Sequence, residues 1–329
     1  GALKNIEKKF SNLQKSLLSL PGKFTVFSNM SDWNPAEMIG IKPSLLSLSL
    51  YSELITDSIW SNQRKNYLYQ NVKPNPLMVN FLGSPYIDLR VDLNSFLPSD
   101  LKKSTKEKII KHLLQKIKKN PEIHDKIEFE LIETFFDIDS HSKIRNYLTK
   151  KDTDEYVKSL KKLTNNFLNL KQLQAEITKV KSLKYKQDNI YKKKMNSIES
   201  IFFLLHDCKE FGTLPFSGIA RCAFVATKIL RTLVKKNIIS QLDYNSFFGS
   251  ITNIQKKINN TLLKNKNKNK FFKEYGHLRP MTYSIISPNY EEGFKNYFKI
   301  KNLEYKVTKK FNIEKHKKNK ISKIFFKNN

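Results

Sequence analysis

Three short segments of the chain carry polar side chains that are close enough in sequence to act on one small ligand. The first is Ser31-Asp32-Trp33-Asn34-Pro35, in which a hydroxyl, a carboxylate and an amide surround a tryptophan. Short polar residues before a proline favour a turn, and a turn can present these groups to a small polar ligand. An Asx-turn whose indole packs in the core is the alternative that this local pattern leaves open.

The second segment, residues 88–94 (DLRVDLN), alternates polar and apolar residues. Alternate side chains of a strand share one face. On a strand the polar face would consist of Asp88, Arg90, Asp92 and Asn94. The guanidinium between two carboxylates could form a structural ion pair, or it could bind a substrate carboxylate or phosphoryl oxygen with its planar fork.

The third segment, residues 275–283 (YGHLRPMTY), places His277 and Arg279 two positions apart. An extended backbone would direct both side chains the same way, and a histidine near neutrality can carry a proton. A buried histidine beside a surface arginine is the alternative. A related segment, residues 212–221 (GTLPFSGIAR), leads into a predicted helix. Arg221 would lie in its first turns, where free N–H groups favour anions.

The charge of the chain does not lead to these segments. The 329 residues carry a net charge of +30, but only six of the 60 basic residues are arginine. Base readout and phosphate binding favour arginine, so a solvated lysine surface is a better interpretation than a nucleic-acid interface. Residues 21–100 contain six basic and seven acidic residues and both tryptophans. The specialised segments therefore begin where the charge excess is absent.

The elements that must position these residues are mostly helical. The pattern predicts an α+β fold, a predominantly helical domain with a small antiparallel sheet in the N-terminal third. Gly83-Ser84-Pro85 suits a tight hairpin between two of the strands. The predicted strands are 23–27, 76–82, 86–91 and 126–136, and the predicted helices include 3–19, 44–63, 99–119, 150–184, 187–203, 214–235 and 240–264.

Several classes of site have no motif in this sequence. There is no glycine-rich phosphate loop, and the histidines and cysteines lack the spacing of a zinc site, so we expect neither a nucleotide nor a metal on this chain. Two cysteines, Cys208 and Cys222, suggest a reducing compartment, and we expect a cytoplasmic protein. No apolar run approaches the roughly 18 residues of a membrane span, so none is expected.

Four segments, taken in order, resemble one known family. Residues 31–40, 83–94 (GSPYIDLRVDLN), 212–221 and 275–283 are similar to the acceptor-binding domain of phosphoenolpyruvate-synthase-like ATP-dependent phosphotransferases. The resemblance spans about residues 20–295 and is closest to the L-glutamine kinases of capsule biosynthesis. One departure is that Met281 stands where relatives tend to have glycine, which puts close backbone approach to a ligand there in doubt.

The resemblance implies a division of labour. In such enzymes an ATP-grasp domain binds ATP and Mg²⁺, a swivelling domain carries a phosphohistidine, and the acceptor domain presents the substrate. The resemblance implies that this chain is the acceptor part of a kinase that phosphorylates the amide nitrogen of L-glutamine. We expect residues 1–20 to be a linker helix, 21–300 the acceptor domain, and 301–329 a basic tail leading to a missing module. The fragment alone should be inactive.

The resemblance also implies the site residues. His277 is expected to be the catalytic proton carrier, and the substrate-binding residues are expected to be Ser31, Asp32, Asn34, Asp88, Arg90, Asn94, Arg221, Arg279 and Tyr283. We expect a cavity bordered by the Trp33 loop, the Arg90 strand and the His277 turn. Three alternatives stay open: a different acceptor such as another amide, an antibiotic or a sugar; a basic nucleic-acid-binding module; and a docking domain without a pocket.

Overall fold

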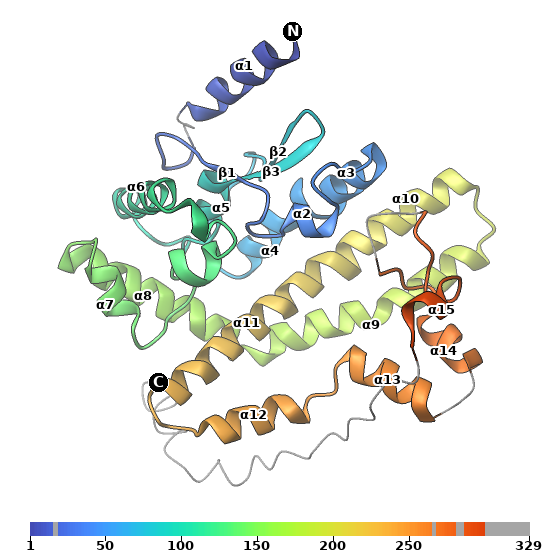
Figure 1. Ribbon diagram of the computed structural model, residues 1–329. Helices are drawn as coiled ribbons and strands as arrows, with labels where there is room; N and C mark the ends of the chain where they lie inside the picture. Colours follow the sequence, from blue (N-terminus) through green and yellow to red (C-terminus); the bar gives the residue numbers. More distant parts are fainter. Residues whose placement is uncertain (16–18, 265–267, 281–285, 300–329) are drawn as a thin grey trace. The chain divides into compact units, whose positions relative to one another are not determined.

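The computed structural model describes residues 1–15, 19–264, 268–280 and 286–299 (Figure 1). The chain forms two compact units, Gly1–Ala226 and Thr227–Asn329. Helices predominate, and the first unit contains a small antiparallel sheet, so the predicted α+β class is confirmed. The predicted basic tail, 301–329, lies outside the described residues.

The sheet has three strands in the order β1-β3-β2. They are β1 (Phe27–Ser28), β2 (Met78–Phe81) and β3 (Ser84–Asp88), and both pairings are antiparallel. The hairpin between β2 and β3 is confirmed. Its two loop residues, Leu82 and Gly83, have φ values of 50° and 84°, as the twist of a two-residue hairpin requires. The side chain of Asn80 accepts a hydrogen bond from the Gly83 N–H at 2.6 Å, which fixes the turn.

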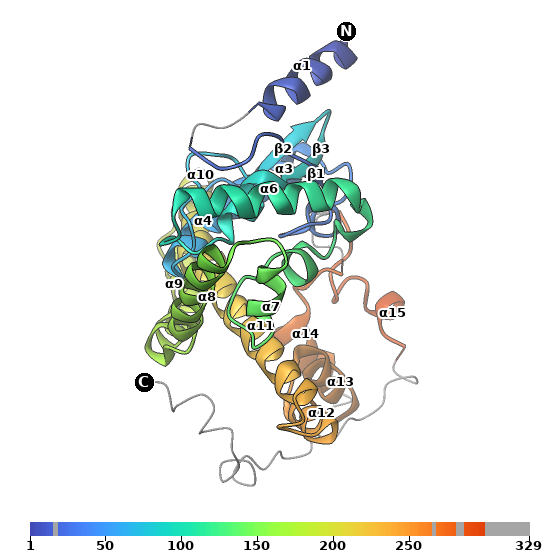
Figure 2. The ribbon, with the colours of Figure 1, turned by 90° about the vertical axis from the view of Figure 1, so that its left-hand side faces the viewer.

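In the described part of the chain, eleven α-helices lie wholly or, in the case of α11, partly in the first unit, and Figure 2 shows them from a second side. They are α1 (Ala2–Gln14), α2 (Pro35–Met38), α3 (Leu45–Tyr51), α4 (Ile59–Asn66), α5 (Leu89–Ser95), α6 (Lys103–Lys119), α7 (Ser140–Arg145), α8 (Lys150–Phe167), α9 (Leu170–Lys192), α10 (Ser197–Asp207) and α11 (Leu214–Lys235). Shorter 3₁₀ and π segments are η1 (Ser52–Thr56), η2 (Pro121–Ile123), η3 (Ile127–Leu131) and η4 (Cys208–Thr213). The bounds of α11 are those predicted from the sequence.

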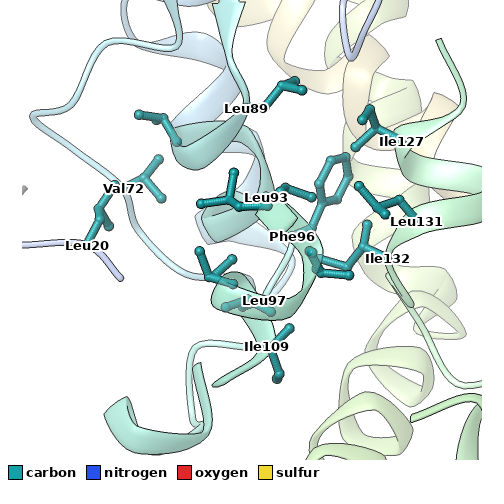
Figure 3. Close-up of a cluster of buried hydrophobic side chains, with 14 of the residues drawn as sticks. Leu20, Val72, Leu89, Leu93, Phe96, Leu97, Ile109, Ile127, Leu131 and Ile132 are labelled. Carbon is teal, nitrogen blue, oxygen red and sulfur yellow. The ribbon is translucent and has the colours of Figure 1, made fainter. Parts of the chain in front are cut away.

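The core of the first unit is built around α5. All seven residues of this helix are buried. Leu89, Leu93 and Phe96 belong to a cluster that also includes Ile109 of α6 and Ile127 of η3 (Figure 3). A helix buried on every side cannot show the polar stripe of a surface helix.

The predicted strand 126–136 is wrong, the predicted strand 86–91 extends beyond the end of β3, and only Phe27 of the predicted strand 23–27 lies in β1. Residues 126–136 contain the π-helical segment η3, because Ile127 and Leu131 are four apart and satisfy a helical period as well as an alternating one. Residues 89–91 begin α5, because the carboxylate of Asp88 caps that helix by accepting the N–H groups of Arg90 and Val91 at 3.0 and 3.2 Å.

The helical stretch from the start of α10 to the end of α11, which continues past the first unit, is unusually apolar. Residues Ser197–Lys235 have a mean hydropathy of 1.2 in their most apolar window and are long enough to cross a membrane by length and composition alone. A core helix of a soluble protein can have the same length and composition but is mostly buried, whereas 28 % of this window is buried.

The described part of the second unit consists of helices joined by turns and irregular segments. Its helices are α12 (Gln241–Ser250), α13 (Ile254–Lys264), α14 (Lys268–Tyr275) and α15 (Phe294–Tyr297). Phe271 is fully buried there, and its ring contacts those of Tyr275, Tyr290, Phe294 and Phe298.

Candidate ligand cavity

The first unit contains a cavity of about 490 Å³. Five segments line it: the loop 30–34, α2, α4, residues 125–129 and the beginning of α11. Pockets for small ligands have volumes of about 300–1,000 Å³, so this cavity is large enough for a small polar molecule. Three exposed phenylalanines, Phe129, Phe216 and Phe224, belong to its lining.

The loop 30–34 is held in an unusual backbone conformation. Trp33 and Asn34 have φ values of 60° and 20°, which residues other than glycine seldom adopt. The surrounding structure supports this loop: the Tyr51 hydroxyl donates to the Trp33 carbonyl, and the Asn34 side chain accepts the N–H of Glu37 to cap α2. Such backbone strain is concentrated at binding and catalytic sites. Here it places the side chains of Ser31 and Asp32 in the cavity lining.

Arg64 projects from α4 into the same lining and is 1 % exposed. Its Nη2 pairs with the carboxylate of Asp32, and its Nη1 donates to the side-chain oxygen of Gln63 at 3.2 Å. The guanidinium lies over the Phe96 ring, 4.1 Å from the ring centroid. Three contacts therefore fix the orientation of this side chain.

Arg221 reaches the cavity from α11 and is 4 % exposed. It pairs with the carboxylate of Glu128, and its guanidinium lies 5.1 Å from the centroid of the Phe96 ring. Burial, with the charge of Arg64 adding to it, lowers the pKa of Arg221 to about 10. Arg221 is still protonated at neutral pH. The two arginines thus share one aromatic platform, and a carboxylate is paired with each.

Gly218 of α11 lies against the side chain of Glu176 from α9. A Cβ atom at Gly218 would overlap the carboxylate of Glu176, so a larger residue there would require that side chain to shift. Glu176 in turn accepts a hydrogen bond from the Tyr67 hydroxyl. Burial raises the pKa of Glu176.

The charges of the lining contrast with those of the whole chain. Four acids line the cavity, Asp32, Glu37, Asp125 and Glu128, against two arginines. Among the residues that the structure describes, no lysine lines it, although lysine and arginine total 60 in the chain. A cavity with this balance favours a ligand that carries a cationic group together with an anionic or polar one, and it disfavours a polyanion.

Several buried polar atoms around the cavity have no hydrogen-bond partner among the described residues. They are Ser31 Oγ, Trp33 Nε1, Gln63 Nε2, Arg64 Nε and Arg221 Nε of the lining, and both carboxyl oxygens of Asp92, which does not itself line the cavity. Buried polar groups are nearly always hydrogen-bonded, so a concentration of exceptions calls for an explanation. A polar ligand or ordered water in the cavity would supply the partners.

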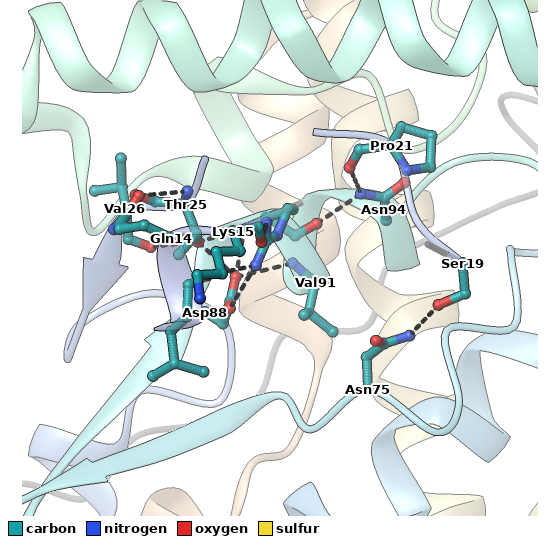
Figure 4. A network of polar contacts seen from close by, with 12 residues as sticks. Gln14, Lys15, Ser19, Pro21, Thr25, Val26, Asn75, Asp88, Val91 and Asn94 are labelled. Atoms are coloured by element: carbon teal, nitrogen blue, oxygen red, sulfur yellow. Dashed lines mark hydrogen bonds and ion pairs between the residues drawn. The ribbon is translucent and has the colours of Figure 1, made fainter. Parts of the chain in front are cut away.

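The structure brings four of the predicted binding residues to this cavity. Ser31, Asp32, Asn34 and Arg221 line it together, although Arg221 is far from the others in sequence. Asp88, Arg90 and Asn94 do not line it, so the expectation that the segment of Arg90 borders the cavity beside the Trp33 loop is wrong. These three lie instead in a buried polar network that ties the N-terminal segment to α5 (Figure 4).

The members of that network are engaged with one another and with the backbone. Asp88 accepts the Thr25 hydroxyl, Arg90 donates to the carbonyls of Lys15 and Leu13 at 2.6 and 2.8 Å, and Asn94 donates to the Pro21 carbonyl at 2.9 Å. Burial raises the pKa of Asp88 despite these bonds. The expectation that the polar residues of 88–94 share one face is wrong, because they lie on a helix and its cap rather than on a strand.

The remaining predicted residues belong to the second unit. His277 is exposed, and Arg279 donates to the Ser287 carbonyl and lies 3.7 Å from Glu292. Tyr283 lies outside the described residues. The predicted roles of these three residues stay predictions.

Sequence reasoning missed three residues of the cavity lining: Gln63, Arg64 and Glu128. Arginine is rare in this chain, and Arg64 follows an apolar helical run, which is a signal that could have identified it. Glu128 lies in a segment whose alternation predicted a strand, and nothing local distinguishes it from its neighbour Glu130.

Comparison with known proteins found no matching family model, no similar curated protein and no similar solved structure. Among the described residues, no group of three or more histidine, cysteine or acidic side chains is placed to hold a metal ion.

Proposed function

We propose that the cavity holds a small zwitterionic acceptor, L-glutamine, and that the chain is the acceptor-binding part of an ATP-dependent phosphotransferase that phosphorylates the amide nitrogen. The observation that carries the proposal is the combination of unpartnered buried donors with four carboxylates and two fixed arginines around one cavity. The family resemblance of the four sequence segments supplies the reaction and the acceptor.

The proposed roles follow from the charges. The carboxylates of Asp32 and Glu37 suit an α-ammonium, and the guanidiniums of Arg64 and Arg221 suit a carboxylate or the arriving phosphoryl group. Ser31 would hydrogen-bond the amide. Phosphoryl transfer depends on positioning and charge neutralisation more than on covalent chemistry by the protein, and an acceptor pocket supplies both.

In this proposal ATP and Mg²⁺ bind to an ATP-grasp domain, and a phosphohistidine domain delivers the phosphoryl group. Both would belong to the same full-length protein. His277 stays the proposed proton carrier. The lysine-free lining supports a small-molecule acceptor over a nucleic acid, because binding to nucleic acid depends on basic groups that contact phosphates.

Isothermal titration of the 329-residue protein with L-glutamine tests the proposal. We expect saturable binding that Arg221→Lys weakens about tenfold or more, since loss of the planar fork costs at least about 1.4 kcal/mol. The matched control is Arg145→Lys, an exposed arginine outside the cavity, which should bind as wild type does. If another amide, an antibiotic or a sugar gives heat of binding and glutamine gives none, that compound takes the place of glutamine as the proposed acceptor. No binding of any of them would overturn the proposal.

A further inference from the structure

Asp92 is the least expected charged group near the cavity. It lies in the first turn of α5 with no exposed surface, and neither of its carboxyl oxygens has a hydrogen-bond partner among the described residues. Burying a carboxylate without partners costs several kcal/mol, so an isolated ion at this position would be strongly destabilising. An apolar residue at this position would avoid that cost, so the presence of an aspartate there calls for an explanation.

Asp92 interacts with the charges of both cavity arginines, although neither of its carboxyl oxygens has a hydrogen-bond partner among the described residues. Asp92 and Phe96 are four residues apart and therefore share one face of α5. The Phe96 ring carries both guanidiniums, of Arg64 from α4 and of Arg221 from α11. The charged groups that act on Asp92 from the packed elements are Asp32, Arg64, Arg221 and Asp88.

The charges of this cluster balance without Asp92. Asp32 is paired with Arg64, and Glu128 is paired with Arg221. A third negative charge would face no unpaired cation. Desolvation, with the charge of Asp32 adding to it, raises the pKa of Asp92 well above its ordinary value. The neutral acid is therefore the form compatible with the ligand-free cluster.

We propose that Asp92 is the reserve counter-ion of Arg64 and Arg221: its carboxyl carries a proton while Asp32 and Glu128 hold the guanidiniums, and it ionises when a cationic ligand group draws Asp32 away. The proton passes to solvent, and no covalent bond of the protein changes. Asp92 is a positioning residue in this scheme, since it acts through the arginines. The ligand-linked half of the proposal rests on the proposed function, whereas the ligand-free half does not.

Infrared difference spectroscopy of the ligand-free protein tests the first half. Subtracting the spectrum of Asp92→Asn from that of the wild type at pH 7 should reveal the C=O band of a protonated carboxylic acid. In an Asp32→Asn background the same subtraction should show this band lost, because Arg64 then needs Asp92 as an anion. Glu128→Gln, which frees Arg221, is the second variant should Asp32→Asn fail to fold. The matched control is Glu37→Gln, a lining acid that forms no ion pair among the described residues, which should keep the band.

Titration with L-glutamine in two buffers of different protonation enthalpy tests the second half. Wild type should release up to about one proton per glutamine bound at pH 7, and Asp92→Asn should release none. Absence of the acid band, or its persistence in both counter-ion variants, overturns the assignment whatever the ligand. Glutamine binding without proton release overturns the ligand-linked half alone. No glutamine binding overturns the proposed function, and the spectra still decide the role of Asp92.

Discussion

The first unit has two buried polar clusters, the N-terminal network and the cluster around the cavity. Both include residues of α5, and they differ in how many of their polar atoms have hydrogen-bond partners. In the N-terminal network, Asp88 accepts three hydrogen bonds and both Nη atoms of Arg90 donate to backbone carbonyls, which leaves Arg90 Nε and Asn94 Oδ1 unpartnered. Around the cavity, seven side-chain atoms have no partner among the described residues.

This difference separates two uses of buried polarity. A cluster whose donors and acceptors meet within the protein holds chain segments together and stabilises the fold. A cluster with unmet donors beside an open volume keeps its hydrogen-bonding capacity for a ligand. Mutations in the two clusters should therefore differ in whether they reduce stability or binding.

The largest effect is expected from Arg90→Met, which keeps most of the apolar stem and removes the guanidinium. Losing one partner of a buried pair costs about 3–5 kcal/mol, so the free energy of unfolding of the first unit should fall by that amount. Urea unfolding followed by tryptophan fluorescence measures it, because Trp33 and Trp60 both lie in this unit. Arg145→Met, an exposed control, should change stability by at most about 0.5 kcal/mol. Wild-type stability of Arg90→Met would contradict the structural role of the network.

A matched pair of hydroxyl deletions sharpens the comparison. Thr25→Val removes a buried hydroxyl that donates to Asp88, and it should lower the free energy of unfolding by about 1–3 kcal/mol. Ser31→Ala removes a buried hydroxyl that has no partner, so stability should be unchanged or slightly higher. Glutamine affinity should respond in the opposite order. Equal losses of stability in the two variants would show that both clusters serve the fold alone.

The smallest effect concerns two buried acids with opposite pKa shifts. Hydrogen bonds from Lys108 and Thr149 lower the pKa of Asp152, so its stabilisation is present above the ordinary aspartate pKa and is lost as pH falls through the folded value. Asp152→Asn should therefore cost about 0.5–1 kcal/mol at pH 7 and less in acid, because Lys108 is half exposed.

The pKa of Asp92 is raised, so the stabilisation from its protonated form is present at low pH and is lost as pH rises through the folded pKa. Asp92→Asn should consequently gain stability relative to wild type as pH rises. Unfolding curves measured across pH 4–8 provide the test, and slopes of the same sign for the two variants would contradict the contrast between partnered and unpartnered acids.

Local patterns predicted much of this fold. The hairpin followed from Gly83 between two β-rich runs, and the bounds of α11 followed from helical periodicity. The strands predicted within 88–94 and 126–136 were wrong. Alternation also satisfies a helical period when apolar residues recur four apart, and full burial removes the polar stripe that would distinguish a helix from a strand.

The candidate site was only partly predictable for a related reason. The Trp33 loop and Arg221 stood out by residue type. Arg64 lies in α4 and Glu128 lies in η3. Long-range packing brings these two elements to Asp32 and Arg221, and such packing leaves no mark in a local sequence pattern. Arg90 and Arg221 were both predicted to bind substrate, yet one is bonded to the backbone and the other lines the cavity.

The distribution of primary amines has a practical consequence. Since none of the cavity-lining side chains in the described part of the chain is a lysine, acylating reagents should decorate the exterior densely and spare the pocket. The protein can thus be tethered to a biosensor surface through its amines, and small-molecule capture can be measured there without occluding the place where capture is expected.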